Sequence, residues 1–158
     1  MTRPSFHLLA LAAVIAWAPA SRAAAPTIAA SGAWARPTPP GASTGAVYLT
    51  LTNHGRTADS LVSATTPAAA RVVFHSMSMT GGVMRMTPIT AGIPIGPNGA
   101  VQFSPGGSHV MLTGLKGPLK TGAHVRVVFT FAKAGPVSVD VPVRDAAPEA
   151  DPMAGMKM

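Results

Sequence analysis

Four methionines and a histidine lie within the twelve residues HSMSMTGGVMRM, residues 75–86. The thioether of methionine is a soft ligand that suits Cu(I) and is used poorly by hard cations. Methionine is also a flexible apolar side chain that fills irregular gaps in a core. The segment therefore has two interpretations, a soft-metal site or an ordinary part of the hydrophobic core.

The Gly-Gly pair at residues 81–82 predicts a two-residue hairpin turn in this segment. Because side chains alternate between the two faces of a strand, His75 and all four methionines should then share one face. A longer turn would shift the pairing but would leave the alternation within each strand unchanged. With the two-residue turn, two pairs of methionines face each other across the hairpin: Met79 with Met84, and Met77 with Met86.

A second cluster, SHVMLTGL at residues 108–115, combines a histidine with a methionine. Val110 and Leu112 share one face of this predicted strand and should point into the core. His109 and Met111 share the other face, where an apolar thioether gains less from burial. A lone His-x-Met pair is typical of an ordinary strand. Next to the hairpin, however, the two segments together can present two imidazoles and two thioethers to one Cu(I) ion.

These side chains must be positioned by β-strands, because the chain between residues 28 and 143 alternates apolar and polar residues between Gly- and Pro-rich breaks. Residues 45–53, 124–131 and 136–143 show the alternation over their whole length. No sustained helical period is present. Together the segments predict an all-β fold, a single antiparallel sandwich or barrel. Further strands are predicted at residues 28–35, 60–64, 71–79, 83–87, 100–103 and 108–112.

The N-terminal segment indicates export. Arg3 precedes an apolar run at residues 7–18 that is too short for a membrane span, and small residues permit cleavage after Ala20 or Ala23. Residues 1–23 are therefore predicted to be a secretory signal peptide and residues 24–144 the folded domain. Residues 145–158 have too little apolar bulk to pack and are predicted to form a flexible tail.

Composition excludes several function classes. The formal charge of +7, which becomes +5 without Arg3 and Arg22, is spread singly along the chain and does not resemble a nucleic-acid-binding surface. The chain has no cysteine, which a blue-copper electron-transfer site requires. An enzyme is not expected, because carboxylates are few and no Ser-His-Asp arrangement or cofactor loop is recognisable. A copper carrier and a metal-free exported binding module remain as alternatives.

The combined pattern closely resembles the PCuA(C) family of periplasmic copper chaperones. The family signature is a His, ten residues, a Met, about twenty-one residues, and then His-x-Met. Here ten residues separate His75 from Met86, and twenty-two separate Met86 from His109. The additional residue falls in the stretch ITAGIPIGPNGA, where a change of loop length costs little. The resemblance extends from AWARPTPPGASTGAVYLTLTN to FTFAKAGPVSVDVPV, nearly the whole predicted domain.

The resemblance implies a cupredoxin-like β-barrel that binds Cu(I) through two His and two Met. It further implies a periplasmic monomer that delivers copper during cytochrome c oxidase assembly, either to a copper-accepting membrane oxidase subunit or to another periplasmic copper chaperone. Copper scavenging for homeostasis is the alternative role. Met77 matches a variable Met of the motif and is a second-rank candidate. Carried over by position, the ligands are His75, Met86, His109 and Met111.

The C-terminal tail departs from the family pattern. Many relatives have a His- and Met-rich C-terminal extension that is associated with Cu(II). The tail of this chain contains Met153, Met156 and Met158 but no histidine. A Cu(II) site is therefore not expected in the tail, whereas transient capture of Cu(I) by its thioethers is consistent with its composition.

Overall fold

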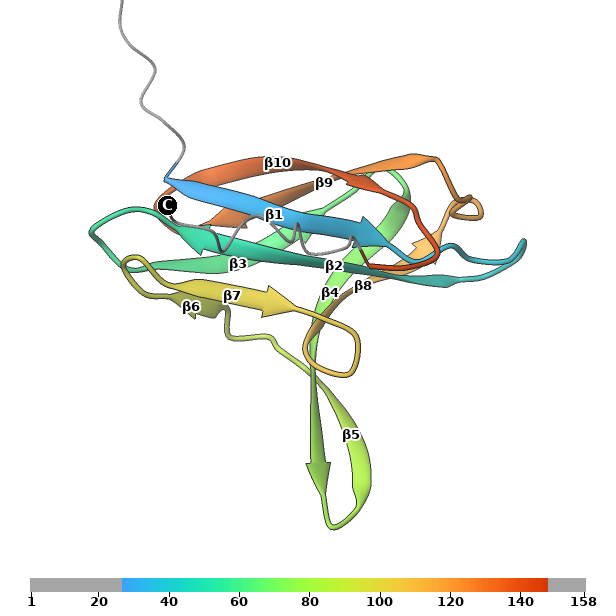
Figure 1. Cartoon of the computed structure of the whole chain (residues 1–158), viewed down its shortest axis with the longest axis horizontal. Helices are drawn as coiled ribbons and strands as arrows, with labels where there is room; N and C mark the ends of the chain where they lie inside the picture. Colours follow the sequence, from blue (N-terminus) through green and yellow to red (C-terminus); the bar gives the residue numbers. More distant parts are fainter. Residues whose placement is uncertain (1–26, 148–158) are drawn as a thin grey trace, which may run out of the picture.

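Strands make up the regular structure of residues 27–147, the part of the chain that the computed structural model describes (Figure 1). Among these residues no helix is long and apolar enough to cross a membrane. The predicted signal peptide and most of the predicted tail lie outside them. The strands are β1 (Ile28–Ala35), β2 (Thr44–Asn53), β3 (Asp59–Thr65), β4 (Ala69–Thr80), β5 (Val83–Pro88), β6 (Ile93–Ile95), β7 (Ala100–Phe103), β8 (His109–Leu115), β9 (His124–Phe131) and β10 (Gly135–Pro142).

The strands form two antiparallel sheets. One has the order β1-β2-β8-β4-β5, and the other has the order β10-β9-β3-β6. β7 and β8 follow one another along the same edge of β2: residues 49–52 of β2 pair with β7, and residues 44–47 pair with β8. An isolated parallel bridge between Ala35 and Val143 joins the ends of the two sheets. The predicted all-β antiparallel fold is thus confirmed.

The core lies between the sheets and follows the alternation seen in the sequence. On β9 every second side chain is buried, because one face of the strand packs on the opposite sheet while the other meets solvent. On β8, Val110 and Leu112 are fully buried, as predicted. The inward residues of the two strands with the clearest pattern are Val47, Leu49 and Leu51 of β2, and Val125, Val127, Phe129 and Phe131 of β9.

The buried carboxylate of Asp59 fixes the turn between β9 and β10. It accepts hydrogen bonds from the backbone N–H groups of Ser60, Lys133 and Ala134 over 2.7, 2.9 and 2.8 Å. Burial raises the pKa of Asp59, but these N–H groups and the charge of Lys133 outweigh burial and hold the pKa below its usual value. Both carboxylate oxygens accept hydrogen bonds from the backbone, so this acidic group has a structural role.

β4 connects the sandwich to the methionine-rich hairpin. Its residues 69–75 pair with β8, and its residues 75–80 pair with β5. The β4–β5 hairpin therefore extends beyond the sandwich (Figure 1). Gly81 and Gly82 have φ angles of 60° and 76°, the left-handed conformations that a two-residue hairpin turn of this type needs at both positions. The predicted register is confirmed: Met79 lies opposite Met84, and Met77 opposite Met86.

Candidate metal centre

His75 lies at the junction between the sandwich and the hairpin. It is the last residue of β4 paired with β8, where it faces His109, and the first paired with β5, where it faces Pro88. The two imidazole rings stack with their centroids 5.6 Å apart and their planes inclined by 22°. Strand pairing thus brings together the two histidines that the sequence predicted as ligands.

The thioethers lie on the same face of the sheet as the two imidazoles. Met111 follows His109 by two residues on β8, and the intervening Val110 is buried in the core on the other face. Met77 and Met86 face each other one step beyond His75, toward the tip of the hairpin. This face is the outer face of the sheet, where a side chain can meet an ion without disturbing the core.

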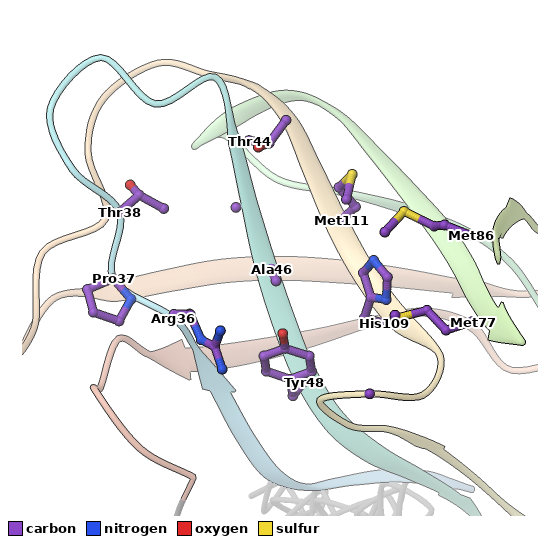
Figure 2. Close-up of a pocket in the computed structure, with 12 residues that line it drawn as sticks. Arg36, Pro37, Thr38, Thr44, Ala46, Tyr48, Met77, Met86, His109 and Met111 are labelled. Carbon is purple, nitrogen blue, oxygen red and sulfur yellow. The ribbon is translucent and has the colours of Figure 1, made fainter. Parts of the chain in front are cut away.

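A cavity of about 330 Å³ lies on this outer face (Figure 2). Three of the four predicted ligands line it, and His75 is stacked against one of them. Figure 2 shows the sulfur atoms of Met77, Met86 and Met111 gathered around the imidazole of His109. The lining residues are Arg36, Pro37, Thr38, Thr44, Gly45, Ala46, Tyr48, Met77, Met86, Gly106, His109 and Met111.

A backbone contact orients the imidazole of His109, which is only 6% exposed. Its Nδ1 lies 3.3 Å from the carbonyl oxygen of Gly107, in the loop that links β7 to β8. Since a carbonyl oxygen only accepts, Nδ1 is the donor, and the lone pair of Nε2 is left for a metal ion. Such a contact holds a ligating imidazole in one tautomer and one orientation.

One nitrogen of the His75 imidazole, Nδ1, is buried and has no hydrogen-bond partner among residues 27–147. Burial of an unpaired polar atom typically costs about 1–3 kcal/mol. A metal ion bound by this imidazole would compensate for that cost. Burial lowers the pKa of His75, and the nearby His109 lowers it further. The ring is therefore held in the neutral form, which is the form that binds a metal.

The charge of the cavity favours a soft monovalent ion. Its lining contains no carboxylate, and Arg36 adds a positive charge. Across residues 27–147, no three His, Cys, Asp or Glu side chains lie close enough to hold a metal ion, so a site built on the two histidines needs other donors, and the thioethers lie beside them. Neutral imidazole and thioether donors suit Cu(I), whereas a divalent ion would enter without charge compensation.

Two cavity residues, Tyr48 and Arg36, were not predicted from the sequence. Tyr48 falls on the polar face of β2 by alternation, yet it is only 8% exposed. Trp34 lies opposite it on β1 and packs on its ring, with centroids 4.8 Å apart. Arg36 follows directly after β1 in the Pro-rich loop that borders the cavity. The pairing of β1 with β2 creates this wall, and no local pattern in the sequence specifies that pairing.

Comparison with known proteins gives a family match over most of the chain. The model of the LpqE-like family, described as "Putative lipoprotein LpqE-like", matches residues 28–143. "Putative lipoprotein Lxx21020" from Leifsonia xyli subsp. xyli is 33% identical over 100 residues, which cover 63% of this chain and 60% of that protein. The matched region thus spans about 60% of the length of this relative.

Solved structures of PCuAC domains have the same fold. The copper-bound PCuAC domain from PmoF2 superposes with a TM-score of 0.63 and 25% identity, covering 77% of this chain and 94% of that domain. The solution structure of CuI-DR1885 from Deinococcus radiodurans has a TM-score of 0.57 and 32% identity, covering 80% and 83%. Apo-DR1885 has a TM-score of 0.59 and 29% identity, covering 92% and 96%. The cupredoxin-like fold implied by the sequence resemblance is confirmed.

Proposed function

The chain belongs to the LpqE-like family, and we propose that it is an exported copper chaperone that binds one Cu(I) ion and delivers it to the copper centre of a respiratory oxidase. The resemblance to PCuA(C) proteins is confirmed by the structural neighbours, two of which were solved with copper bound. These neighbours support a copper-binding, chaperone-like role, and the chain is not an enzyme.

The observation that carries this proposal is the pairing of His75 with His109 beside a cavity lined by thioethers. It supports a coordination sphere in which neutral nitrogen and sulfur donors surround a soft ion. Met77 lines the same cavity and is a further candidate. Half-exposed Met86 leaves the ion open to exchange with an incoming ligand, as a carrier requires. The proposed ligands are His75, Met86, His109 and Met111.

The location and partners are also part of the proposal. The family and the Leifsonia relative are both described as lipoproteins, which supports export of this chain. We place the protein in the periplasm as a monomer. The recipient is a copper-accepting oxidase subunit at the membrane or another periplasmic copper chaperone.

The purified chain should bind one equivalent of Cu(I) tightly enough to compete with a strong Cu(I) chelator. Zn(II) should bind much more weakly, because the cavity offers no carboxylate or thiolate. An anaerobic competition titration with each metal measures both affinities. Zinc binding as tight as that of Cu(I) would contradict the thioether site. Mixing the loaded protein with a copper-free oxidase copper domain tests delivery, and retention of copper by the chaperone would favour scavenging instead.

Ending the chain at Arg144 should leave the tight Cu(I) site intact. The backbone N–H groups of Val143 and Arg144 donate to the carbonyl oxygens of Ala123 and Ala35, so both residues belong to the scaffold. The deleted residues 145–158 contain three methionines and no histidine. We expect unchanged affinity for the first Cu(I) equivalent and loss only of weak additional capacity in a chelator titration. Loss of the tight site on truncation would place it in the tail.

A further inference from the structure

Two methionines of the β4–β5 hairpin lie beyond the candidate metal centre. Met79 and Met84 face each other near the turn, on the face that also carries Met77 and Met86. Their side chains are 67% and 53% exposed. We propose that Met79 and Met84 form an outer Cu(I) site, which captures the ion and passes it inward along the hairpin to the centre described above. This inference rests on the proposed function.

Packing does not account for these two methionines. The hairpin extends beyond the sandwich, so its outer residues contribute little to the core. Thioether side chains gain their usual advantage only when they are buried. The opposite face of the same hairpin carries the polar facing pair Ser78 and Arg85 and, beside the turn, Thr80 facing Val83. The apolar face is thus made of sulfur-bearing side chains in particular.

The geometry of the pair suits a soft ion. Side chains directly opposite in an antiparallel pair have Cβ atoms about 4.5–5.5 Å apart. The flexible methionine side chain allows two such sulfur atoms to approach one ion from either side. Without an imidazole, this site should bind Cu(I) more weakly than the inner centre does.

The position of the pair suits transfer. Successive residues on one face of a strand are about 6.7 Å apart, so the Met77 and Met86 pair lies one step inward and His75 one step further. Exposure falls along β4, from 67% at Met79 to partial burial at Met77 and His75, and His109 opposite His75 is only 6% exposed. At each step a Cu–S bond to the outer methionine breaks as a bond forms to a sulfur atom further inward or, at the inner centre, to an imidazole nitrogen. The copper remains Cu(I), and no proton moves because thioethers and neutral imidazoles bind through free lone pairs.

The test replaces both outer methionines by leucine, Met79→Leu with Met84→Leu, which keeps their volume and removes their lone pairs. The matched control is Val83→Leu, a change at a 59% exposed residue on the other face of the hairpin. We expect unchanged affinity for the first Cu(I) equivalent and loss of a weaker second equivalent. Uptake from a small Cu(I) chelator should slow about tenfold, because the outer pair no longer concentrates copper beside the inner site.

A direct measurement of ligation accompanies the kinetics. In the parent protein with labelled methionine methyl groups, a second equivalent of Ag(I), a redox-inert substitute for Cu(I), should shift the NMR signals of Met79 and Met84. If the parent lacks a tight site, the proposed function itself fails. If the parent binds tightly but the double variant matches it in rate and stoichiometry, only the outer site is refuted. If the double variant took up Cu(I) more slowly only from a donor protein and not from the small chelator, Met79 and Met84 would belong to a protein contact. That result would also overturn the outer site.

Discussion

Replacing Met86 and Met111 together by leucine should abolish tight Cu(I) binding while leaving the sandwich folded. Leucine has nearly the volume of methionine but no lone pair. Met86 is 51% exposed and Met111 is partly buried on the outer face of the sheet, so neither side chain supports the core. Each lost ligand should lower the affinity by more than the roughly 10- to 100-fold that loss of a residue supporting a ligand costs.

The matched control for this double variant replaces Met153 and Met156 by leucine, which removes two thioethers from the tail. The control should compete with a strong Cu(I) chelator as the parent does. Circular dichroism and thermal unfolding establish that both variants are folded. If the Met86 and Met111 variant retained the parent's affinity, the assignment of these two ligands would be wrong.

The affinity for Cu(I) should fall as the pH is lowered, with a steepness set by the two histidines. A histidine binds metal only when neutral, and its ordinary pKa is about 6.5. Burial and the nearby His109 lower the pKa of His75, so protons displace copper from His75 only below that ordinary range. Thioethers have no proton to gain in this range. Weaker binding by Met86 and Met111 should therefore persist in acid.

The measurement is Cu(I) affinity against a chelator between neutral and acid pH, corrected for protonation of the chelator. The variants His75→Ala and His109→Ala should each give a shallower profile than the parent. A flat profile in the parent, or variants as steep as the parent, would remove the histidines from the coordination sphere. In the copper-free protein, the lowered pKa of His75 means that unfolding takes up a proton, so its contribution to stability declines as the pH falls below about 6.5.

Much of the scaffold was predictable because local patterns determine it. The alternation on β9 follows directly from a strand buried on one face, and the two-glycine turn determines which methionines face each other across the hairpin. β6 does not follow from the sequence, which indicates only a loop-rich stretch at this position. It has only three residues, Ile93–Ile95, with a proline at its centre, and therefore offers no alternation to recognise. It forms because β3 provides an edge for it to pair with.

The site was predictable in its donor types but not in its surroundings. His75, His109 and the methionines could be placed on single faces by parity within each strand. The direct pairing of His75 with His109 depends on how β4 and β8 align, and that alignment is set by the whole sheet. The cavity wall formed by Tyr48 and Arg36 likewise depends on tertiary pairing of β1 with β2.

The unbroken course of β4 restricts how this segment can vary during evolution. The pairing of β4 with β8 inside the sandwich determines the face on which the thioethers lie, because the same strand continues into the hairpin. Insertion of one residue between Phe74 and Met77 would turn the following methionines to the opposite face without altering the composition of the hairpin. Insertion of two would restore the face but move the sulfur atoms about 6.7 Å outward. Homologues that keep the cargo should therefore conserve the length of this segment more strictly than its sequence.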